Sequence, residues 1–416
     1  MILNHPKLYL FKNNSGKSFI YSGYTGFILE DSPRIQNHLE NIEFDEEVDR
    51  YLLGESGEDP FLESLLPTKP FVDTILFFVT NQCNLACSYC YERANNVHNL
   101  KKLDIKTFKT TVLYFIENFE HQNVINIGFF GGEPLLNFPL IKESIKVLKE
   151  ISSTRNIIFH YCITTNGTLL NDEIIDFLIS HNVNIGISID GTETLHDLHR
   201  KFLDGRGSYR VIIENVAKLA KYCNITAQIT ITDYKIDLIE LYQELENNGF
   251  SAIKTECVVS PKFKNSSDDL QCFSENLQLF ADYFISNLRK KRIIKYIDLL
   301  GVLKNLHFGS SRFLPCNTGF NKYSVATDGS IYFCQRFMNL PEFKWGNAIK
   351  ELDLKKREQF LKRHIVTMRG LGRCKDCWAQ RVCGGTCYHA SYVETGITER
   401  ISELYCGFRK VIYEKA

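Results

Sequence analysis

The chain of 416 residues has no excess of charge of either sign, because Lys and Arg together number 49 and Asp and Glu together also number 49. Nothing in its composition therefore favours binding to nucleic acid or to an anionic membrane surface. It also lacks an apolar run near the roughly 20 residues that a membrane-spanning helix needs. Residues 1–6 (MILNHP) show no basic segment followed by an apolar one, as a secretory signal would. We expect a cytoplasmic protein that has neither nucleic acid nor a membrane as a partner.

The chain has no tandem repeat apart from an alternation of β-type and α-type segments. Six apolar, β-rich runs are separated by segments with the helical period. The β-rich runs lie at residues 74–80, 124–130, 157–163, 183–189, 225–231 and 252–259, and the helical segments include 104–122, 140–151, 171–180, 209–222 and 235–248. This order predicts a parallel sheet, rolled or open, within residues 71–306. Functional side chains are then expected just after the strands.

The two ends of the chain differ from this middle part. Residues 1–70 predict a small α+β element, with strands at 7–11 and 18–29, helices at 33–41 and 45–53, and a linker at 54–70. Residues 307–416 are rich in loops and hold seven of the 14 cysteines. In a reducing compartment the cysteines of this chain indicate metal ligands or reduced thiols rather than disulfides. The region has too little apolar sequence for a core of its own, so we expect metal to support its fold.

The sequence carries a Cys-x3-Cys-x2-Cys triplet, Cys83, Cys87 and Cys90, just after the first predicted strand. Three thiolates can hold three irons of a four-iron cluster and leave the fourth iron open for chemistry. The run Gly131-Gly132-Glu133-Pro134 follows the second strand. Two glycines allow a ligand to approach the backbone, and a carboxylate can accept from an ammonium group, although alone such a run is more often a turn. Polar residues also follow the next two strands, so we expect one shared site.

Residues 74–260 resemble the core of the radical S-adenosylmethionine (SAM) superfamily, which carries Cys-x3-Cys-x2-Cys after the first strand and Gly-Gly-Glu after the second. The resemblance implies an α/β fold with a partial (β/α)6 barrel, a [4Fe–4S] cluster on Cys83, Cys87 and Cys90, and SAM on the open iron. It implies that SAM is contacted by Tyr89, Gly131, Gly132, Glu133, Pro134, Asn166, Ser188 and Asp190, with Arg210 as the candidate partner of the SAM carboxylate. His196 and His199 are expected to be packing or capping residues rather than ligands.

The C-terminal cysteines resemble the seven-cysteine pattern of the SPASM domain, which holds two auxiliary iron–sulfur clusters. By this resemblance Cys316, Cys334 and Cys387 serve auxiliary cluster I, and Cys374, Cys377, Cys383 and Cys406 serve auxiliary cluster II. The chain would then hold three [4Fe–4S] clusters. Two auxiliary clusters need eight cysteines, so cluster I is predicted to have an open iron, a non-cysteine ligand, or a distant thiol such as Cys272 or Cys257. A structural zinc ribbon is the alternative.

One position bears on the choice between subfamilies. Sulfatase-maturing relatives place an Asp, thought to be the base, directly after the cysteine that corresponds to Cys334, but here that residue is Gln335. Glutamine cannot take up a proton. The run CQRF at residues 334–337 looks instead like the Cys-His-Arg stretch of cross-linking peptide maturases.

We therefore predict a peptide maturase in which a 5′-deoxyadenosyl radical takes a hydrogen atom from a ribosomally synthesised precursor peptide. The expected product is an intramolecular cross-link, preferably a thioether, with a carbon–carbon or other link nearly as favoured. A flavodoxin or ferredoxin is the expected reductant. Residues 1–70 form either a winged-helix element that captures the peptide as an added strand, or a simple extension packed on the barrel. The alternatives are sulfatase maturation, which forms formylglycine, and a non-enzymatic electron-transfer protein with several clusters.

Overall fold

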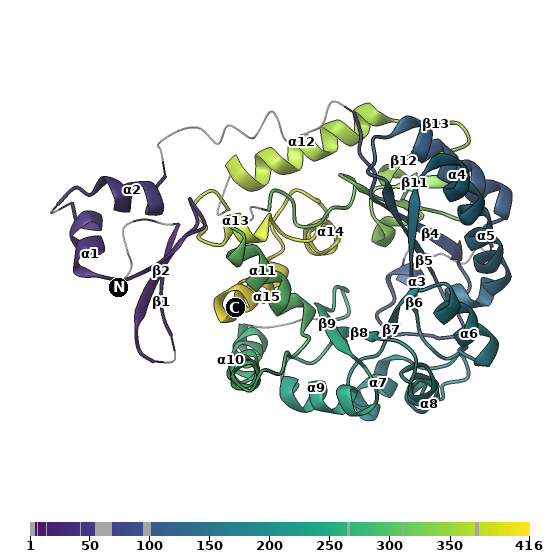
Figure 1. The fold of residues 1–416 in the computed structure, drawn as a ribbon, viewed down its shortest axis with the longest axis horizontal. Helices are drawn as coiled ribbons and strands as arrows, with labels where there is room; N and C mark the ends of the chain where they lie inside the picture. The colour runs from purple at the N-terminus through teal and green to yellow at the C-terminus, as the bar shows by residue number, and fades with distance from the viewer. Residues whose placement is uncertain are drawn as a thin grey trace. The chain divides into compact units, whose positions relative to one another are not determined.

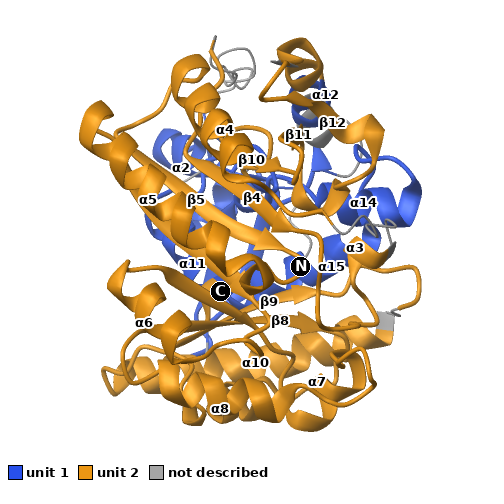
Figure 2. Cartoon of the chain, turned by 90° about the vertical axis from the view of Figure 1, so that its right-hand side faces the viewer, with its two compact units in different colours: residues 1–66, 298–316, 360–416 blue, residues 67–297, 317–359 orange. Residues whose placement is uncertain are grey.

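The structure is a computed structural model. It describes residues 5, 7–13, 15–41, 43–54, 69–94, 101–263, 267–309, 312–370 and 374–416. The chain forms two compact units (Figure 2), of which the first comprises residues 1–66, 298–316 and 360–416 and the second residues 67–297 and 317–359. The first unit thus combines N-terminal and C-terminal segments. No helix of the described residues is long and apolar enough to cross a membrane.

The second unit is built on six parallel strands that neighbour one another in chain order. These strands are β4 (Thr74–Thr80), β5 (Val124–Gly131), β6 (Ile158–Thr165), β7 (Asn184–Ser188), β8 (Ile225–Ile231) and β9 (Ala252–Cys257). The helices that alternate with them are α4 (Ile105–Asn118), α5 (Phe138–Arg155), α6 (Asp172–Ser180), the short α7 (Glu193–His199), α8 (Tyr209–Leu219), α9 (Leu238–Asn247) and α10 (Ser267–Arg289). Figure 1 shows the helices around the outside of the curved row of strands. The predicted partial (β/α)6 arrangement is confirmed.

Strand β4 forms where apolar residues run almost without interruption, because both faces of a covered parallel sheet are buried. All residues of β4 after Thr74 are buried, and they read ILFFVT. Three of the helices, α4, α6 and α9, begin at side-chain caps: Asp104, for example, accepts from the backbone N–H of Thr107 at 2.8 Å before α4. Helix α5 ends at Asn156, whose φ of 51° is left-handed, a conformation that asparagine tolerates. Strand and helix boundaries therefore follow local chemistry that the sequence displays.

The sheet continues beyond the six strands in a way that the sequence did not predict. Strand β10 (Lys322–Val325) pairs parallel with β4, and β11 (Ser330–Tyr332), β12 (Lys344–Asn347) and β13 (Glu351–Leu352) follow in antiparallel order. These strands lie in the region that was expected to be loop-rich and cysteine-dependent. Arg357 is buried beside them and its Nε donates to the Gly319 carbonyl at 2.9 Å. Val325, Ile331 and Trp345 of these strands are buried as well, so part of the region has an apolar core.

The first unit holds a three-stranded antiparallel sheet and two helices at the N-terminus. The elements are β1 (Leu8–Lys12), β2 (Ser18–Ser22), β3 (Ile28–Glu30), α1 (Pro33–Leu39) and α2 (Glu46–Leu52). The prediction of one strand at 18–29 is wrong, because the backbone N–H of Gly26 donates to Ser22 at 2.8 Å and closes a turn there. Gly26 has a φ of +86°, which favours glycine. Most of the predicted linker, residues 55–68, lies outside the described residues.

The rest of the first unit is short helices and loops. It includes α11 (Ile297–His307), the end of α12 (Leu354–Gly370), α13 (Gln380–Cys383), α14 (Tyr388–Thr395) and α15 (Glu403–Lys415). The N-terminal sheet packs on this part: the ring of Tyr9 stacks on Trp378 with centroids 4.2 Å apart. At Gly23 a Cβ atom would lie 2.4 Å from the Trp378 carbonyl oxygen, so the two segments approach as closely as their backbones allow.

Candidate cluster and cofactor site

The three cysteines of the triplet line one cavity of about 480 Å³ in the second unit. Gly132 and residues 81–85 line the same cavity. The pKa of the Cys83 thiol is raised to about 12, chiefly by burial, and the nearby Glu133, Cys87 and Cys90 contribute to the rise. Three soft sulfur donors beside an open space are the donor set that a site-differentiated iron–sulfur cluster needs. The residues present therefore fit the predicted cluster with SAM beside it.

The loop that begins at the end of β4 is attached to the glycine pair after β5. The backbone N–H of Gly132 donates to the Thr80 carbonyl at 3.0 Å, and that of Glu133 donates to the Gln82 carbonyl at 2.7 Å. A Cβ atom at Gly132 would lie 2.3 Å from the Gln82 oxygen, and Gly131 has a φ of +128°. The two glycines are therefore needed, first of all, because the backbone of residues 80–82 packs directly against them. Pro134 follows as the first residue of the short helix η1 (Pro134–Asn137).

Glu133 is fully buried and its carboxylate is engaged by protein donors. It accepts from the backbone N–H of Leu135 at 3.0 Å, the Thr165 hydroxyl at 2.7 Å and the backbone N–H of Asn166 at 2.7 Å. Burial raises its pKa to about 7, although these hydrogen bonds act in the opposite direction. Glu133 thus joins the carboxyl ends of β5 and β6. The expected contact with the SAM amine stays a prediction.

Asn166 lies next to the first cysteine of the triplet. Its Nδ2 donates to Asn84 Oδ1 at 2.9 Å and lies 4.0 Å from the Cys83 sulfur. Asn84 donates in turn to the Thr168 hydroxyl at 2.8 Å, and that hydroxyl donates to Asn166 Oδ1 at 2.7 Å. The structure therefore brings Asn166 to the loop of residues 81–90 that carries the cysteine triplet, here called the cluster loop. It adds Asn84 and Thr168, which sequence reasoning did not assign to the site. The position of Asn84 directly after Cys83 was the available signal.

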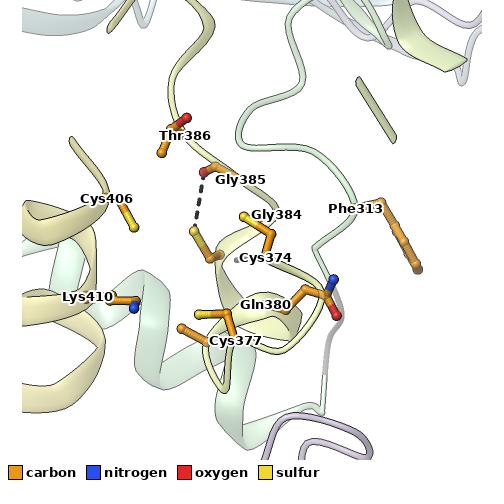
Figure 3. Close-up of a pocket in the computed structure, with 11 residues that line it drawn as sticks. Phe313, Cys374, Cys377, Gln380, Gly384, Gly385, Thr386, Cys406 and Lys410 are labelled. Carbon is orange, nitrogen blue, oxygen red and sulfur yellow. Dashed lines mark hydrogen bonds between the residues drawn. The ribbon is translucent and has the colours of Figure 1, made fainter. Parts of the chain in front are cut away.

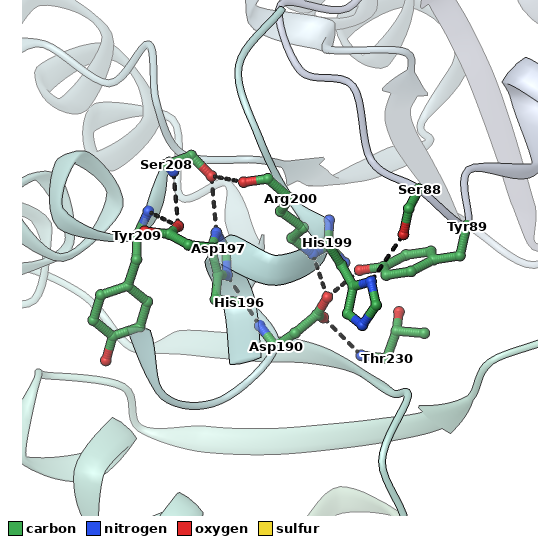
Figure 4. Close-up of polar contacts among 10 residues, drawn as sticks. All are labelled: Ser88, Tyr89, Asp190, His196, Asp197, His199, Arg200, Ser208, Tyr209 and Thr230. Atoms are coloured by element: carbon green, nitrogen blue, oxygen red, sulfur yellow. Dashed lines mark hydrogen bonds and ion pairs between the residues drawn. The ribbon is translucent and has the colours of Figure 1, made fainter. Parts of the chain in front are cut away.

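Tyr89 and Asp190 also come together (Figure 4). The Tyr89 hydroxyl contacts Asp190 Oδ2, and the same oxygen accepts from Arg200 Nε at 2.8 Å. The other carboxylate oxygen accepts from the backbone N–H of Thr230 at 3.0 Å. Asp190 and Arg200 are both buried. The sequence did not single out Arg200, because an Arg at the end of a short helix carries no distinctive pattern.

Two other predicted contacts lie outside this set of bonds. Ser188 ends β7 and is half-buried. Arg210 is 80% exposed and its guanidinium pairs with Glu193 at 2.7 Å. The structure does not bring Arg210 to the cysteine triplet, so its assignment to the SAM carboxylate rests on the resemblance alone.

The two histidines after β7 have structural partners. His196 is buried, accepts from the backbone N–H of Asp190 through Nδ1 at 3.2 Å, and therefore donates through Nε2 to the Ser208 hydroxyl at 2.8 Å. Burial and the nearby Arg200 lower its pKa to about 3. His199 Nδ1 and the Ser88 hydroxyl lie 2.9 Å apart. These contacts agree with the expected packing and capping roles.

Four C-terminal cysteines line one cavity in the first unit (Figure 3). They are the four predicted for auxiliary cluster II: Cys374, Cys377, Cys383 and Cys406. The pKa of the Cys374 thiol is raised to about 12, chiefly by burial, and the other three thiols contribute to the rise. Four sulfur donors fit a fully ligated four-iron cluster. No three His, Cys, Asp or Glu side chains in the described ranges are placed to hold a single metal ion.

The cysteines predicted for auxiliary cluster I are divided between the units. Cys316 and Cys387 belong to the first unit and Cys334 to the second. Cys334 is buried at the start of the short helix η2 (Gln335–Phe337), where its sulfur accepts from the backbone N–H of Arg336 at 3.5 Å. This ligand set stays a prediction.

Comparison with known proteins gives a family. The model of the Radical SAM superfamily matches residues 77–245. A cysteine-type anaerobic sulfatase-maturating enzyme of Clostridium novyi is 30% identical over 292 residues, which cover 64% of this chain and 74% of the relative. Among solved structures, anSMEcpe with bound AdoMet has a TM-score of 0.70 at 19% identity and covers 82% of this chain and 96% of its own. Streptococcus suis SuiB bound to precursor peptide SuiA has a TM-score of 0.58 at 15% identity, with 96% and 98% covered.

The fold of the parallel strands, the cavity lined by the cysteine triplet and the sequence relatives agree with one another. This chain belongs to the radical SAM superfamily.

Proposed function

We propose that this chain is a peptide maturase that uses a SAM-derived radical to form an intramolecular cross-link in a ribosomally made precursor peptide. The observation that carries the proposal is the single cavity lined by Cys83, Cys87 and Cys90 next to Gly132. A bound [4Fe–4S] cluster and SAM supply the radical that removes a hydrogen atom from an unactivated carbon. A thioether is the preferred product, and other cross-links are nearly as favoured.

The chain's own residues would hold the cluster, orient SAM and keep water away from the reacting atoms. Cys83, Cys87 and Cys90 are the ligands we assign to the cluster, and Gly132 and residues 81–82 line the cavity in which SAM would lie. Buried bonds from Glu133 hold the strand ends rigid around it. Such preorganisation on strand ends keeps reacting atoms in place and excludes water.

The peptide part of the proposal has two supports. SuiB, which shares the fold, has been solved with a precursor peptide. In addition, β1 and β3 are the edge strands of the N-terminal sheet among the described residues, since each pairs with β2 alone, and β3 is the more exposed of the two, with Ile28 and Glu30 exposed. An exposed strand edge can capture an extended peptide through main-chain hydrogen bonds. We therefore assign leader-peptide binding to this edge.

Sulfatase maturation is the second candidate, and the 30% identity to the Clostridium novyi enzyme favours it. Gln335 argues against it, because an amide side chain cannot serve as a base. Incubation with a sulfatase-derived Cys or Ser peptide separates the two. Formylglycine in that peptide would support sulfatase maturation and contradict our preferred product.

We also assign two auxiliary clusters to the C-terminal cysteines, with Cys374, Cys377, Cys383 and Cys406 holding the second of them. The shared cavity of these four thiols supports that assignment. A small reducing protein such as a flavodoxin or ferredoxin would then deliver electrons. The first auxiliary cluster would keep an open iron or use a ligand that is not one of the seven C-terminal cysteines.

The test is release of 5′-deoxyadenosine by anaerobically reconstituted, dithionite-reduced protein, followed by mass spectrometry of candidate precursor peptides. We expect release from the natural chain and a mass loss of two hydrogens in the peptide. A variant with Cys83, Cys87 and Cys90 all replaced by Ala should lose release and about four irons per chain. Release that persists in this variant would refute the ligand assignment. If the protein is reduced by dithionite but releases no 5′-deoxyadenosine, a non-enzymatic electron-transfer protein becomes the better interpretation of the chain.

A further inference from the structure

The cavity of the cysteine triplet has one carboxylate among the described residues of its lining, and that carboxylate belongs to Glu92. Glu133, which the sequence singled out, is not among the described residues that line this cavity. It is fully buried and already accepts from three donors. A hydrogen-bond donor that a ligand brings into the cavity therefore meets Glu92 rather than Glu133.

Glu92 follows Cys90 by two residues and lies in the short helix α3 (Tyr91–Ala94). Only 7% of its surface is exposed, and its Oε2 atom is buried without a hydrogen-bond partner in the part of the chain that the structure describes. Arg93 also lines the cavity, but its guanidinium donates to the Leu85 carbonyl at 2.9 Å. The basic side chain next to Glu92 thus has another partner.

A carboxylate in these surroundings needs a partner from outside the chain. Buried polar groups are nearly always hydrogen-bonded, and a buried charge is costly unless it is paired. The cavity has a volume of about 480 Å³, which is enough room for a ligand. A cationic N–H donor is the best complement to a carboxylate, because it cancels the charge and forms the stronger kind of hydrogen bond. Glu92 therefore indicates a site for an ammonium or guanidinium group.

Two reactants must come close to the cluster, SAM and the peptide. The residues that the family resemblance assigns to SAM do not include Glu92. The carbon that loses its hydrogen atom must lie beside the radical, so part of the peptide must enter the same cavity. Within a peptide chain, an ammonium or guanidinium group is carried by the side chains of lysine and arginine.

We propose that Glu92 binds a lysine or arginine side chain of the precursor peptide and so places a basic residue of the substrate beside the cluster of Cys83, Cys87 and Cys90. Glu92 is thus a specificity-determining residue. The inference rests on the proposed function, and it adds the chemical class of the peptide residue that faces the cluster.

The test measures binding of small probes to the reconstituted, reduced, full-length protein, with S-adenosylhomocysteine in place of SAM so that no radical forms. The probes are the Nα-acetyl, N-methylamide derivatives of lysine, arginine and norleucine, of which the last has no charged group. A paramagnetic reduced cluster broadens the proton resonances of a molecule bound beside it, so line widths report binding at this site. We expect at least one basic probe to bind about tenfold more tightly than the norleucine probe.

Variants of Glu92 connect this preference to its charge. E92Q keeps the shape but removes the negative charge, so it should bind the basic and norleucine probes about equally. E92D keeps the charge on a shorter side chain and should retain part of the preference. E143Q, which changes an exposed carboxylate on α5 in the same unit, is the matched control and should retain all of it. Iron content and affinity for S-adenosylhomocysteine should be unchanged in E92Q. If E92Q loses its iron, the preference of the unaltered protein and its reduction in E92D decide the matter.

Three results would overturn the inference. They are equal or absent binding of the basic and norleucine probes by the unaltered protein, a preference that persists in full in E92Q or E92D, and a loss of S-adenosylhomocysteine affinity in E92Q of normal iron content, which would assign Glu92 to the cofactor. Release of 5′-deoxyadenosine by the unaltered protein does not depend on these results, so failure of this inference is distinguishable from failure of the proposed function.

Discussion

Replacement of Glu133 tests how far the site depends on one buried carboxylate. Glu133 accepts from three donors, the backbone N–H groups of Leu135 and Asn166 and the Thr165 hydroxyl, at 2.7 to 3.0 Å. E133A leaves all three donors buried without this acceptor. An unsatisfied buried donor costs about 1–3 kcal/mol, so the lower end of that range already gives a loss of about 3 kcal/mol. We expect the free energy of local opening at the carboxyl ends of β5 and β6 to fall by that amount.

E133Q should cost less, about 1–3 kcal/mol. The glutamine carbonyl can still accept from two donors, but its NH2 group then faces the third. The assay is hydrogen–deuterium exchange of the reconstituted protein, read on peptides that contain Leu135 and Asn166, because a chain with two units need not unfold in one step. The protection of these backbone amides from exchange gives the free energy of local opening around them directly.

The matched control is E143A, which removes an exposed carboxylate from α5, the helix that follows η1. Surface substitutions of this kind usually change stability by less than about 0.5 kcal/mol. Equal protection in E133A and E143A would refute the claim that Glu133 holds the strand ends together.

Three further changes follow from the same structure. G132A places a Cβ atom 2.3 Å from the Gln82 carbonyl oxygen, so we expect the cluster loop to be displaced and iron bound at the triplet to fall, as measured by iron analysis. Joint replacement of Cys374, Cys377, Cys383 and Cys406 by Ala should remove about four irons per chain while SAM-dependent signals of the triplet cluster persist. His196, with its pKa lowered to about 3, must stay neutral in the folded state, so stability present above about pH 6.5 should fall by about 1.4 kcal/mol per unit as pH drops towards 3. Thermal unfolding should show this slope in the natural chain and a shallower one in H196Q.

The sequence predicted the six-stranded core well because each strand there carries its own signal. Strand β4 is an almost uninterrupted apolar run, β8 alternates buried and half-buried residues, and helices α4, α6 and α9 begin at Asp or Asn caps. Their boundaries moved by only a few residues. Such information is local, so no knowledge of the tertiary fold was needed to find these elements.

The prediction of secondary structure is wrong where strands are short or where the strand they pair with is far away in the sequence. Strand β10 has four residues and pairs with β4, which lies about 250 residues earlier in the chain, so neither length nor periodicity reveals it. The run at 18–29 predicts one strand because its turn contains Tyr24 and Thr25, which favour strands, between two glycines. A β-type composition could not show where the chain reverses.

The site shows a related limit. The sequence identified the polar residues at the strand ends, and the family resemblance assigns Glu133, Asn166 and Asp190 among them to the cofactor, which stays a prediction. In the structure their polar atoms bond to other protein groups: Glu133 to the next strand, Asn166 to Asn84, and Asp190 to Arg200. A polar group at a buried strand end must be satisfied before it can serve a ligand. The polar residues at these strand ends therefore serve first to hold the cluster loop and the neighbouring strands in place. A ligand in the cavity of the cysteine triplet would meet the residues that line it, among them Asn81, Gln82, Asn84 and Gly132.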